Sequence, residues 1–390
     1  MSNPRHPKQT VLENIFTDRF GNPPGTITVR SPGRINLIGE HTDYNEGFVL
    51  PGAIDLGVCF ITAPRDDSSF HFIAADMGEE FECTLRSLKK SPMGWPNYLL
   101  GVIEQILKSG RTLPGCDVVF GGDIPIGAGL SSSAAVEAGF AFALNTMFSL
   151  GFSLNELVHI AQNAEREFVG VQCGIMDQFV NIFGKDKHVL RLDCRTLDYE
   201  YFPFDYGHIC FVLCDTGVSR QLATSEYNTR RSQCETGISV LQKDTATIQS
   251  LRDVTLEHLE QYKKILDPLL YKRCEYVVRE NARVLSACKA LLGNDLLLMG
   301  RLMVESHAGL RDGYEVSCRE LDLLVDIAST IPGVIGSRMM GAGFGGCTLN
   351  LIEKLQVADF IQVVNCEYQK VTHRDVRTYV VEIRTGTRCV

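Results

Sequence analysis

Apolar residues in the first half of the chain follow two alternating patterns, short β-branched runs and longer stretches with helical spacing. The short runs predict strands at residues 26–30, 48–62, 70–75, 116–120, 189–192 and 199–204. The longer stretches predict helices at residues 97–108 and 153–168. Ser153 and Glu156 form a capping-box pattern, which places the start of the second helix.

The same alternation starts again after Gly207, with longer helical stretches. It predicts strands at residues 209–214, 334–338, 347–351 and 379–383, and helices at residues 226–241, 272–292 and 296–309. A further helix is expected to begin at the capping-box pattern of Ser317 and Glu320. No repeat or flexible linker separates the two halves. We therefore predict two αβ domains, residues 1–205 and 206–390, with the functional site in a cleft between them.

The composition indicates a globular protein with enough length for two large cores. Of its 390 residues, 45% are hydrophobic and 22% are charged, which excludes a disordered chain. The 38 Lys and Arg residues are outnumbered by 47 Asp and Glu residues, so the net charge is −9. This charge argues against nucleic-acid binding through the overall field, but it leaves room for a local basic pocket that holds a small anion.

The 14 cysteines raise the question of a disulfide framework. The first ten residues are polar and no Cys-x-x-Cys pair occurs, so we expect reduced thiols in a cytoplasmic protein. Residues 138–155 carry no charge and are about as long as a membrane span. Because Asn145 and Ser149 lie within them and Glu137 and Glu156 flank them, we predict a buried helix followed by a turn, and no membrane partner.

Residues 127–134, Gly-Ala-Gly-Leu-Ser-Ser-Ser-Ala, form the first candidate site. A glycine turn that leads into a helix presents free backbone N–H groups and the positive end of the helix dipole, which suits phosphate. A lone serine there would only cap the helix, but two glycines and three serines exceed what a cap needs. The sequence has no Walker A motif, and its Gly-x-Gly-x-x-Gly at residues 341–346 lies between two predicted strands, the wrong context for dinucleotide binding.

Two further segments concentrate polar groups that could carry chemistry. Residues 31–44 contain Arg34, Glu40, His41 and Asp43, which can satisfy the donors and acceptors of sugar hydroxyls. In residues 173–178, Asp177 has apolar neighbours, which raise the pKa of a carboxyl group unless a cation lies close. An isolated Asp at a helix start is most often a cap, and the sequence does not place Arg34 beside it.

Together these segments resemble the GHMP small-molecule kinases. The resemblance rests on residues 32–45, 127–133, 173–178, 225–227 and 341–346, which follow the order of the family along most of the chain. It implies an α+β fold with two domains, the first like ribosomal protein S5 domain 2 and the second ferredoxin-like. The active site would lie between the two domains.

The resemblance also implies a reaction, ATP-dependent phosphorylation of the anomeric C1 hydroxyl of α-D-galactose to galactose 1-phosphate. Asp177 would act on that hydroxyl, as a base or by orienting it, with Arg34 as its cationic neighbour. Ser133 and Glu165 would hold Mg²⁺, and Trp95 would lie near the adenine. The sugar would contact Arg34, Glu40, His41, Asp43, Gly174, Asp177 and Tyr227. The phosphates of ATP would lie on Gly127, Ala128, Gly129, Leu130, Ser131, Ser132 and Ser133.

Three other functions compete with this one. An N-acetylgalactosamine kinase would depart from the sequence at Thr42 and Asn45, which here agree with the galactose-specific pattern. A galactose sensor without catalysis would lack residues after the serine run, whereas Ser133 is followed here by Ala134 and Ala135. The glycine loops also suggest a nicotinamide oxidoreductase, although less strongly. We expect a monomer or a weak homodimer.

Overall fold

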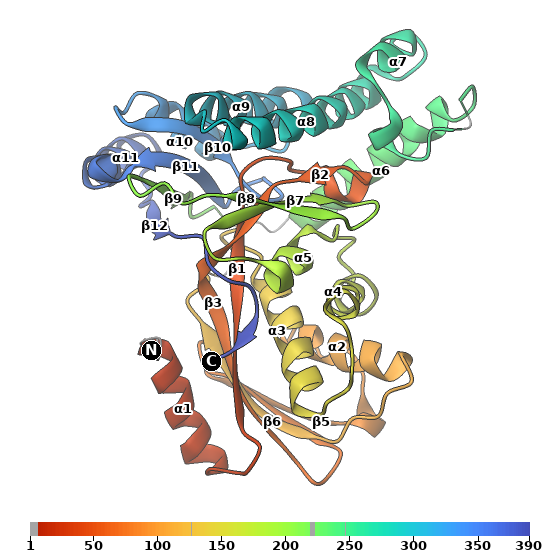
Figure 1. Ribbon diagram of the computed structural model, residues 1–390, viewed down its shortest axis with the longest axis vertical. Coiled ribbons are helices and arrows are strands. Elements are labelled where there is room, and N and C mark those ends of the chain that lie inside the picture. Colours follow the sequence, from red (N-terminus) through yellow and green to blue (C-terminus); the bar gives the residue numbers. More distant parts are fainter. Residues whose placement is uncertain (1–6, 126, 219–222, 246) are drawn as a thin grey trace.

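The computed structural model describes residues 7–125, 127–218, 223–245 and 247–390. Its largest sheet has six strands in the order β13-β1-β3-β6-β4-β5, and only the β4–β6 pair is parallel. These strands are β1 (Ile27–Asn36), β3 (Pro51–Pro64), β4 (Ser69–Ala74), β5 (Glu79–Thr84), β6 (Cys116–Gly122) and β13 (Arg388–Cys389). Figure 1 shows this sheet in the lower half of the molecule, with α1 (Pro7–Phe20) on one side of it and α2 (Pro96–Lys108) and α3 (Ser132–Met147) on the other.

The alternation of apolar residues along β3 explains why both faces of this sheet are covered. Phe60 belongs to the core beneath α2 and α3, where its ring stacks on Phe120 with centroids 5.6 Å apart. Its neighbour Ile61 points to the opposite face and packs with Leu12 and Phe16 of α1. Because successive side chains of a strand point to opposite faces, a long apolar strand of this kind is buried on both.

A smaller sheet and three helical segments complete the first half of the chain. The sheet has the order β2-β7-β8, with β2 (Phe48–Val49), β7 (His188–Asp193) and β8 (Tyr199–Pro203). The helical segments are α4 (Leu154–Asn163), the π-helical turn η3 (Ala164–Val169) and α5 (Met176–Phe183). The capping box of Ser153 and Glu156 is confirmed at the start of α4.

A four-stranded antiparallel sheet organises the second half, in the order β10-β11-β9-β12. Its strands are β9 (Ile209–Asp215), β10 (Val334–Met339), β11 (Cys347–Glu353) and β12 (Arg377–Val381). On one face α10 (Arg319–Ser329) and α11 (Val357–Thr372) pack against it, and on the other face α8 (Pro268–Leu292) and α9 (Leu296–Ala308) do. The second half also contains α6 (Ala223–Leu241), α7 (Leu256–Gln261), the π-helical turn η5 (Gly309–Tyr314), and the short 3₁₀ turns η4 (Leu251–Asp253) and η6 (Lys354–Gln356). Two more 3₁₀ turns, η1 (Asp43–Asn45) and η2 (Leu85–Ser87), belong to the first half.

The mixture of helices and mostly antiparallel sheets confirms the α+β class. One buried cluster runs through both halves, from Phe60 in β3 to Leu213 in β9. Strand β13 returns from the end of the chain to pair with β1, so the last residues lie on the first sheet. The division at residue 205 stays a prediction.

The predicted capping box of Ser317 and Glu320 is wrong. Helix α10 begins after Cys318, which makes no side-chain cap, and the Ser317 hydroxyl instead donates to the Asp322 carboxylate within the helix. Helices α1, α5 and α7 and strands β5 and β13 were not predicted. Among residues 8–20 of α1, whose burial is described, only Leu12 and Phe16 are buried hydrophobic residues, and β13 has two residues. Neither α1 nor β13 therefore carries a strong periodic signal.

The structure bears on two further predictions, the reduced cysteines and the buried helix within residues 138–155. All 14 cysteines are free thiols. Residues 138–155 include the second part of the buried helix α3 and the turn that follows it, as predicted. In the part of the chain that the structure describes, no helix is both long enough and apolar enough to cross a membrane.

Candidate active site

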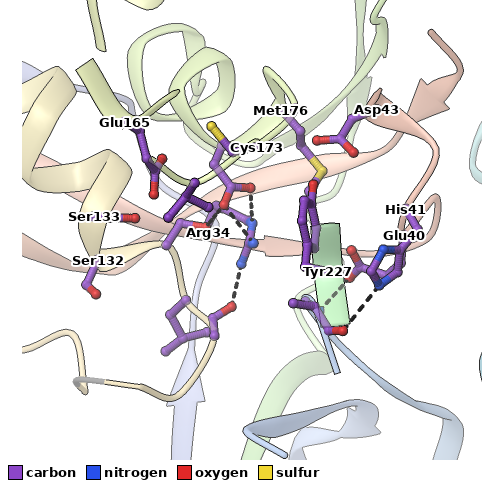
Figure 2. Close-up of a pocket in the computed structure, with 18 of the residues that line it drawn as sticks. Arg34, Glu40, His41, Asp43, Ser132, Ser133, Glu165, Cys173, Met176 and Tyr227 are labelled. Atoms are coloured by element: carbon purple, nitrogen blue, oxygen red, sulfur yellow. Dashed lines mark hydrogen bonds and ion pairs between the residues drawn. The ribbon is translucent and has the colours of Figure 1, made fainter. Parts of the chain in front are cut away.

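Five segments that are distant in sequence line one cavity of about 360 Å³. They are the end of β1 with the loop after it, the glycine-serine loop before α3, residues 165–177, α6, and the glycine loop after β10, and Tyr98 of α2 also lines the cavity. Figure 2 shows the polar side chains of Arg34, Asp43 and Glu165 in this cavity. Every predicted site residue lines it except the buried Ala128 and Trp95, which lines a second cavity described below.

The backbone of residues 127–133 turns sharply before helix α3. Gly127 and Gly129 have φ angles of 80° and 83°, and Ser131 adopts the same left-handed region with φ 60°. A Cβ atom at Gly127 would meet nothing within 4 Å, so the loop backbone borders open space. Ser131 is the N-cap residue of α3, but its hydroxyl makes no cap and donates to Oδ2 of Asp177. The loop therefore contacts the candidate catalytic carboxylate directly.

Arg34 and Asp177 form a bidentate ion pair, a contact that the sequence could not place. Arg34 Nε donates to Asp177 Oδ1 at 2.8 Å, and Nη2 donates to Oδ2 at 3.0 Å. The third nitrogen, Nη1, donates to the carbonyl oxygen of Gly129 at 2.6 Å. Burial disfavours the charge of Arg34, but the carboxylates of Asp177, Glu40 and Asp43 outweigh that cost and raise its pKa. Arg34 is therefore a fixed cation between the glycine-serine loop and Asp177.

The loop after β1 carries the candidate sugar contacts Glu40, His41 and Asp43. Glu40 Oε1 accepts a hydrogen bond of 2.9 Å from the backbone N–H of Gly341, and it lies 3.5 Å from Nη2 of the buried Arg338. His41 has a φ angle of 60°, an uncommon backbone conformation for a residue with a side chain. Its ring centroid lies 5.5 Å from that of Tyr227 in α6, so a residue from each half borders the same space.

Gly174 is the neighbour that lets Asp43 lie in the cavity. A Cβ atom at position 174 would lie 1.8 Å from Asp43 Oδ2 and 2.1 Å from its Cγ. Burial raises the pKa of the Asp43 carboxyl to about 7, and the negative charge of Asp177 adds to the effect. The backbone N–H of Tyr44 and the charge of Arg34 lower this pKa in part, but burial and the negative charges outweigh them.

The raised pKa of Asp43 predicts a pH dependence of stability. Its ordinary value is 3.8, so the folded protein binds this proton more tightly than the unfolded chain and loses stability as the pH rises from about 4 to about 7. The Asp43→Asn variant lacks this loss. Its stability relative to the parent should grow by about 2 to 4 kcal/mol between pH 4 and pH 8. Urea unfolding of both proteins at the two pH values measures this, and a constant difference would contradict it.

Glu165 lies beside Ser133 and beside Glu137 and Gln178, two residues to which the sequence analysis gave no role in the site. Gln178 Nε2 donates to Glu165 Oε2 at 2.7 Å. Burial and the charge of Asp177 raise the pKa of Glu165, while the Ser133 hydroxyl lowers it. Glu137 is fully buried, and neither of its carboxylate oxygens has a hydrogen-bond partner among the described residues. Glu137 is the only acidic or basic residue of the apolar helix α3, and it lies one turn after Ser133. An ionisable residue in an otherwise apolar helix could have marked this position as part of the site.

A second cavity, of about 440 Å³, lies on the other side of the serines and contains Trp95. It shares Tyr98, Ser132 and Ser133 with the first cavity, so the two meet at the start of α3. Trp95 Nε1 donates to Glu79 Oε2 at 2.6 Å, which fixes the indole. The other walls are mostly apolar and include Val58, Phe120, Ile124, Val136 and Val169. A flat apolar group fits such walls better than a charged one does.

Comparison with known proteins agrees with this geometry. Residues 14–64 match the galactokinase galactose-binding signature, residues 97–185 the GHMP kinases N terminal domain, and residues 285–370 the GHMP kinases C terminal domain. The galactokinase of Roseiflexus sp. (strain RS-1) is 42% identical over 375 residues, which cover 96% of this chain and 95% of that protein. The chain belongs to the galactokinase family. The galactokinase of Clostridium beijerinckii is also 42% identical, over 97% of this chain and 98% of its own length.

Solved structures support the same family. The galactokinase of Lactococcus lactis complexed with galactose superposes with a TM-score of 0.94 at 35% identity, over 98% of this chain and 99% of that one. The mevalonate kinase of Methanococcus jannaschii, at 17% identity and a TM-score of 0.64 over 93% of this chain and 100% of its own, shares the fold. The matches to both GHMP kinase domains and to this galactokinase structure confirm the predicted two-domain GHMP kinase fold.

Proposed function

We propose that this protein transfers the γ-phosphoryl group of ATP to the anomeric C1 hydroxyl of α-D-galactose, giving galactose 1-phosphate and ADP. The observation that carries the proposal is the bidentate pair of Arg34 and Asp177 at the junction of two candidate subsites. On one side lies the glycine-serine loop at the start of α3, where the Ser131 side chain makes no cap, and on the other lies a set of donors and acceptors suited to a sugar. Phosphoryl transfer requires such an arrangement, because it depends on positioning and charge neutralisation.

Asp177 is the residue we assign to the reacting hydroxyl. Its Oδ2 accepts hydrogen bonds from Arg34 and Ser131, whereas Oδ1 accepts only the Arg34 Nε–H among the described residues. Oδ1 therefore keeps an acceptor position for the C1 hydroxyl of the sugar, and it can take the proton as the bond to phosphorus forms. Arg34 supplies the positive charge that stabilises the transferring group.

The residues around Ser133 fit a divalent cation that accompanies ATP. Glu165 and Glu137 are buried carboxylates without a cationic partner, and the two oxygens of Glu137 are unsatisfied among the described residues. In the described part of the chain no group of three His, Cys, Asp or Glu side chains could hold a metal ion. Mg²⁺ needs no such group, because one or two carboxylates hold it while phosphates complete the shell. Ser133 and Glu165 would hold it, and when bound it would neutralise phosphate charge.

The cavity beside Trp95 is the proposed site for the adenine of ATP. Since Trp95 is the only tryptophan of the chain, its fluorescence reports on this cavity alone. A non-hydrolysable ATP analogue with Mg²⁺ should change the emission in a saturable way, whereas galactose alone should leave it nearly unchanged. Calorimetric binding of the analogue without any change in emission would contradict the placement.

An assay of sugars with ATP and magnesium tests the proposed function. We expect ADP release with galactose, little with N-acetylgalactosamine, and no reduction of NAD. ADP release with N-acetylgalactosamine alone would favour the kinase for that sugar, and binding of galactose without ADP release would favour a sensor. Reduction of NAD would indicate an oxidoreductase.

The cellular setting is also a proposal. All 14 cysteines are free thiols, and such thiols persist in a reducing compartment, so we place the protein in the cytoplasm. We expect a monomer or a weak homodimer that binds galactose and ATP and neither nucleic acid nor membrane, as its net charge of −9 suggests.

A further inference from the structure

A chain of hydrogen bonds runs from the candidate sugar site into the second half of the protein. His41 Nε2 lies 3.3 Å from the carbonyl oxygen of Ala342, and His41 Nδ1 lies 2.7 Å from Tyr44 Oη. Tyr44 Oη lies 2.8 Å from Tyr314 Oη, which in turn lies 3.2 Å from Cys234 Sγ. The chain thus joins the loop after β1, the loop after β10, the π-helical turn η5 and helix α6.

One carbonyl group fixes the direction of every bond in this chain. A carbonyl oxygen can only accept, so His41 Nε2 must carry a hydrogen. The second nitrogen of a neutral imidazole can then only accept, so Tyr44 donates to Nδ1. With its single hydrogen used there, Tyr44 must accept from Tyr314, and Tyr314 accepts from the thiol of Cys234.

The surroundings keep these groups in the required protonation states. Burial lowers the pKa of His41 to about 3, and the cations Arg230 and Arg338 add to the effect, so the ring is neutral at physiological pH. Burial likewise raises the pKa of Tyr44 and of Tyr314 well above the usual range, so both hydroxyls keep their hydrogens. Tyr314 and Cys234 are fully buried, and therefore water does not supply alternative partners there.

His41 and Ala342 both line the first cavity. The Nε2–H of His41 donates to the carbonyl oxygen of Ala342 at 3.3 Å, which is long for an N–H···O hydrogen bond. A sugar hydroxyl that replaces this bond can accept from His41 and donate to the carbonyl of Ala342. With the hydrogen on Nδ1 instead, the cavity would present two acceptors, and one hydroxyl could satisfy only one of them. The position of a single hydrogen thus decides whether a hydroxyl is recognised here.

We infer that Tyr44 and Tyr314 are positioning residues. The bond that Tyr44 donates orients the imidazole of His41 and satisfies Nδ1, so that the hydrogen stays on Nε2 when one hydroxyl of the sugar binds between His41 and Ala342. This inference rests on the proposed function, because the hydroxyl belongs to galactose. Neither tyrosine hydroxyl needs to touch the substrate. Tyr44 acts on His41 directly, and Tyr314 orients Tyr44.

Calorimetry with Tyr44→Phe tests the inference. The Kd for galactose should rise about tenfold, the factor expected when one buried hydrogen bond is lost, while kcat changes less than about twofold. Tyr314→Phe should show a smaller rise. The matched control is Tyr368→Phe, because Tyr368 is also fully buried but donates to Thr216 in a different core cluster. The control should bind galactose like the parent.

A series of monodeoxygalactoses sharpens the test. If His41 and Ala342 bind one hydroxyl, Tyr44→Phe should weaken all these sugars except the one that lacks this hydroxyl. An equal loss for every sugar would assign Tyr44 a general structural role and overturn the inference. Unchanged galactose affinity in Tyr44→Phe would overturn it as well.

Nuclear magnetic resonance of ¹⁵N-labelled histidine gives a readout that does not depend on activity. The signals of His41 among the 9 histidines are assigned by their loss in His41→Gln. In the parent, the hydrogen should reside on Nε2, and in Tyr44→Phe the Nδ1 signal should shift as it loses its donor. A hydrogen on Nδ1 of the parent would overturn the inference. If the parent does not phosphorylate galactose, the proposed function fails, whereas this spectrum still decides the position of the hydrogen.

Discussion

Asp177→Asn should lower kcat for galactose phosphorylation by about 100- to 10,000-fold, while galactose still binds. The range is the usual contribution of a group that transfers a proton in the transition state. An amide cannot take the proton of the C1 hydroxyl, and it also cannot accept both hydrogen bonds of Arg34, which now go to the two oxygens of Asp177. Galactose binding survives because Glu40, His41 and Tyr227 remain in the cavity.

The matched control for this variant is Asp117→Asn. Asp117 is also a buried carboxylate paired with an arginine, since Arg65 Nη1 donates to it at 2.9 Å, but it does not line the cavity. Its substitution should change stability and leave kcat close to that of the parent. Single-turnover kinetics and galactose calorimetry on both variants separate chemistry from binding. Turnover of Asp177→Asn near the parental rate would remove Asp177 from the reaction.

Gly174→Ala should raise the KM for galactose by about 10- to 150-fold. The added methyl would occupy the position of the Asp43 carboxylate, whose Oδ2 lies 1.8 Å from the required Cβ atom, so Asp43 must leave its place in the cavity. Loss of a hydrogen bond to a charged group costs about 1.5 to 3 kcal/mol, which corresponds to this range. Initial rates at varied galactose measure the change.

Two controls separate this steric effect from a general disturbance of the fold. At Gly207 a Cβ atom would meet nothing within 4 Å, so Gly207→Ala should leave KM unchanged. In an Asp43→Ala background, Gly174→Ala should add little, because the carboxylate that it displaces is already gone. Full additivity of the two substitutions would show that Gly174 acts by another route.

The sequence predicted the chemical groups of the site better than their contacts. The serine run, the cluster from Arg34 to Asp43 and the segment around Asp177 are local patterns whose residue types suit phosphate and sugar. Because the ion pair of Arg34 and Asp177 joins residues 143 positions apart, no local pattern could place it. The same is true of the bond between Tyr44 and Tyr314, which are separated by 270 positions.

Physical reasons also explain why the sequence patterns failed at β13, Ser317 and Glu137. Strand β13 has two residues, and it forms only because the chain end returns to β1. Ser317 had the spacing of a capping box, but α10 begins at Arg319 with Cys318 as its N-cap residue, so Ser317 lies one position too early and its hydroxyl donates to Asp322. Glu137 looked like the flank of an apolar stretch, whereas the fold buries it completely beside the residue that we expect to hold magnesium.

The most direct test of the proposed function is the identity of the product. After incubation of the protein with ATP, magnesium and galactose, phosphorus nuclear magnetic resonance should show ADP and a sugar phosphate whose phosphorus couples to a single proton, the anomeric proton of galactose. The amounts of ADP and sugar phosphate should be equal, because one phosphoryl group is transferred for each ATP consumed. A phosphate on another carbon, or ADP accompanied only by inorganic phosphate, would contradict the account.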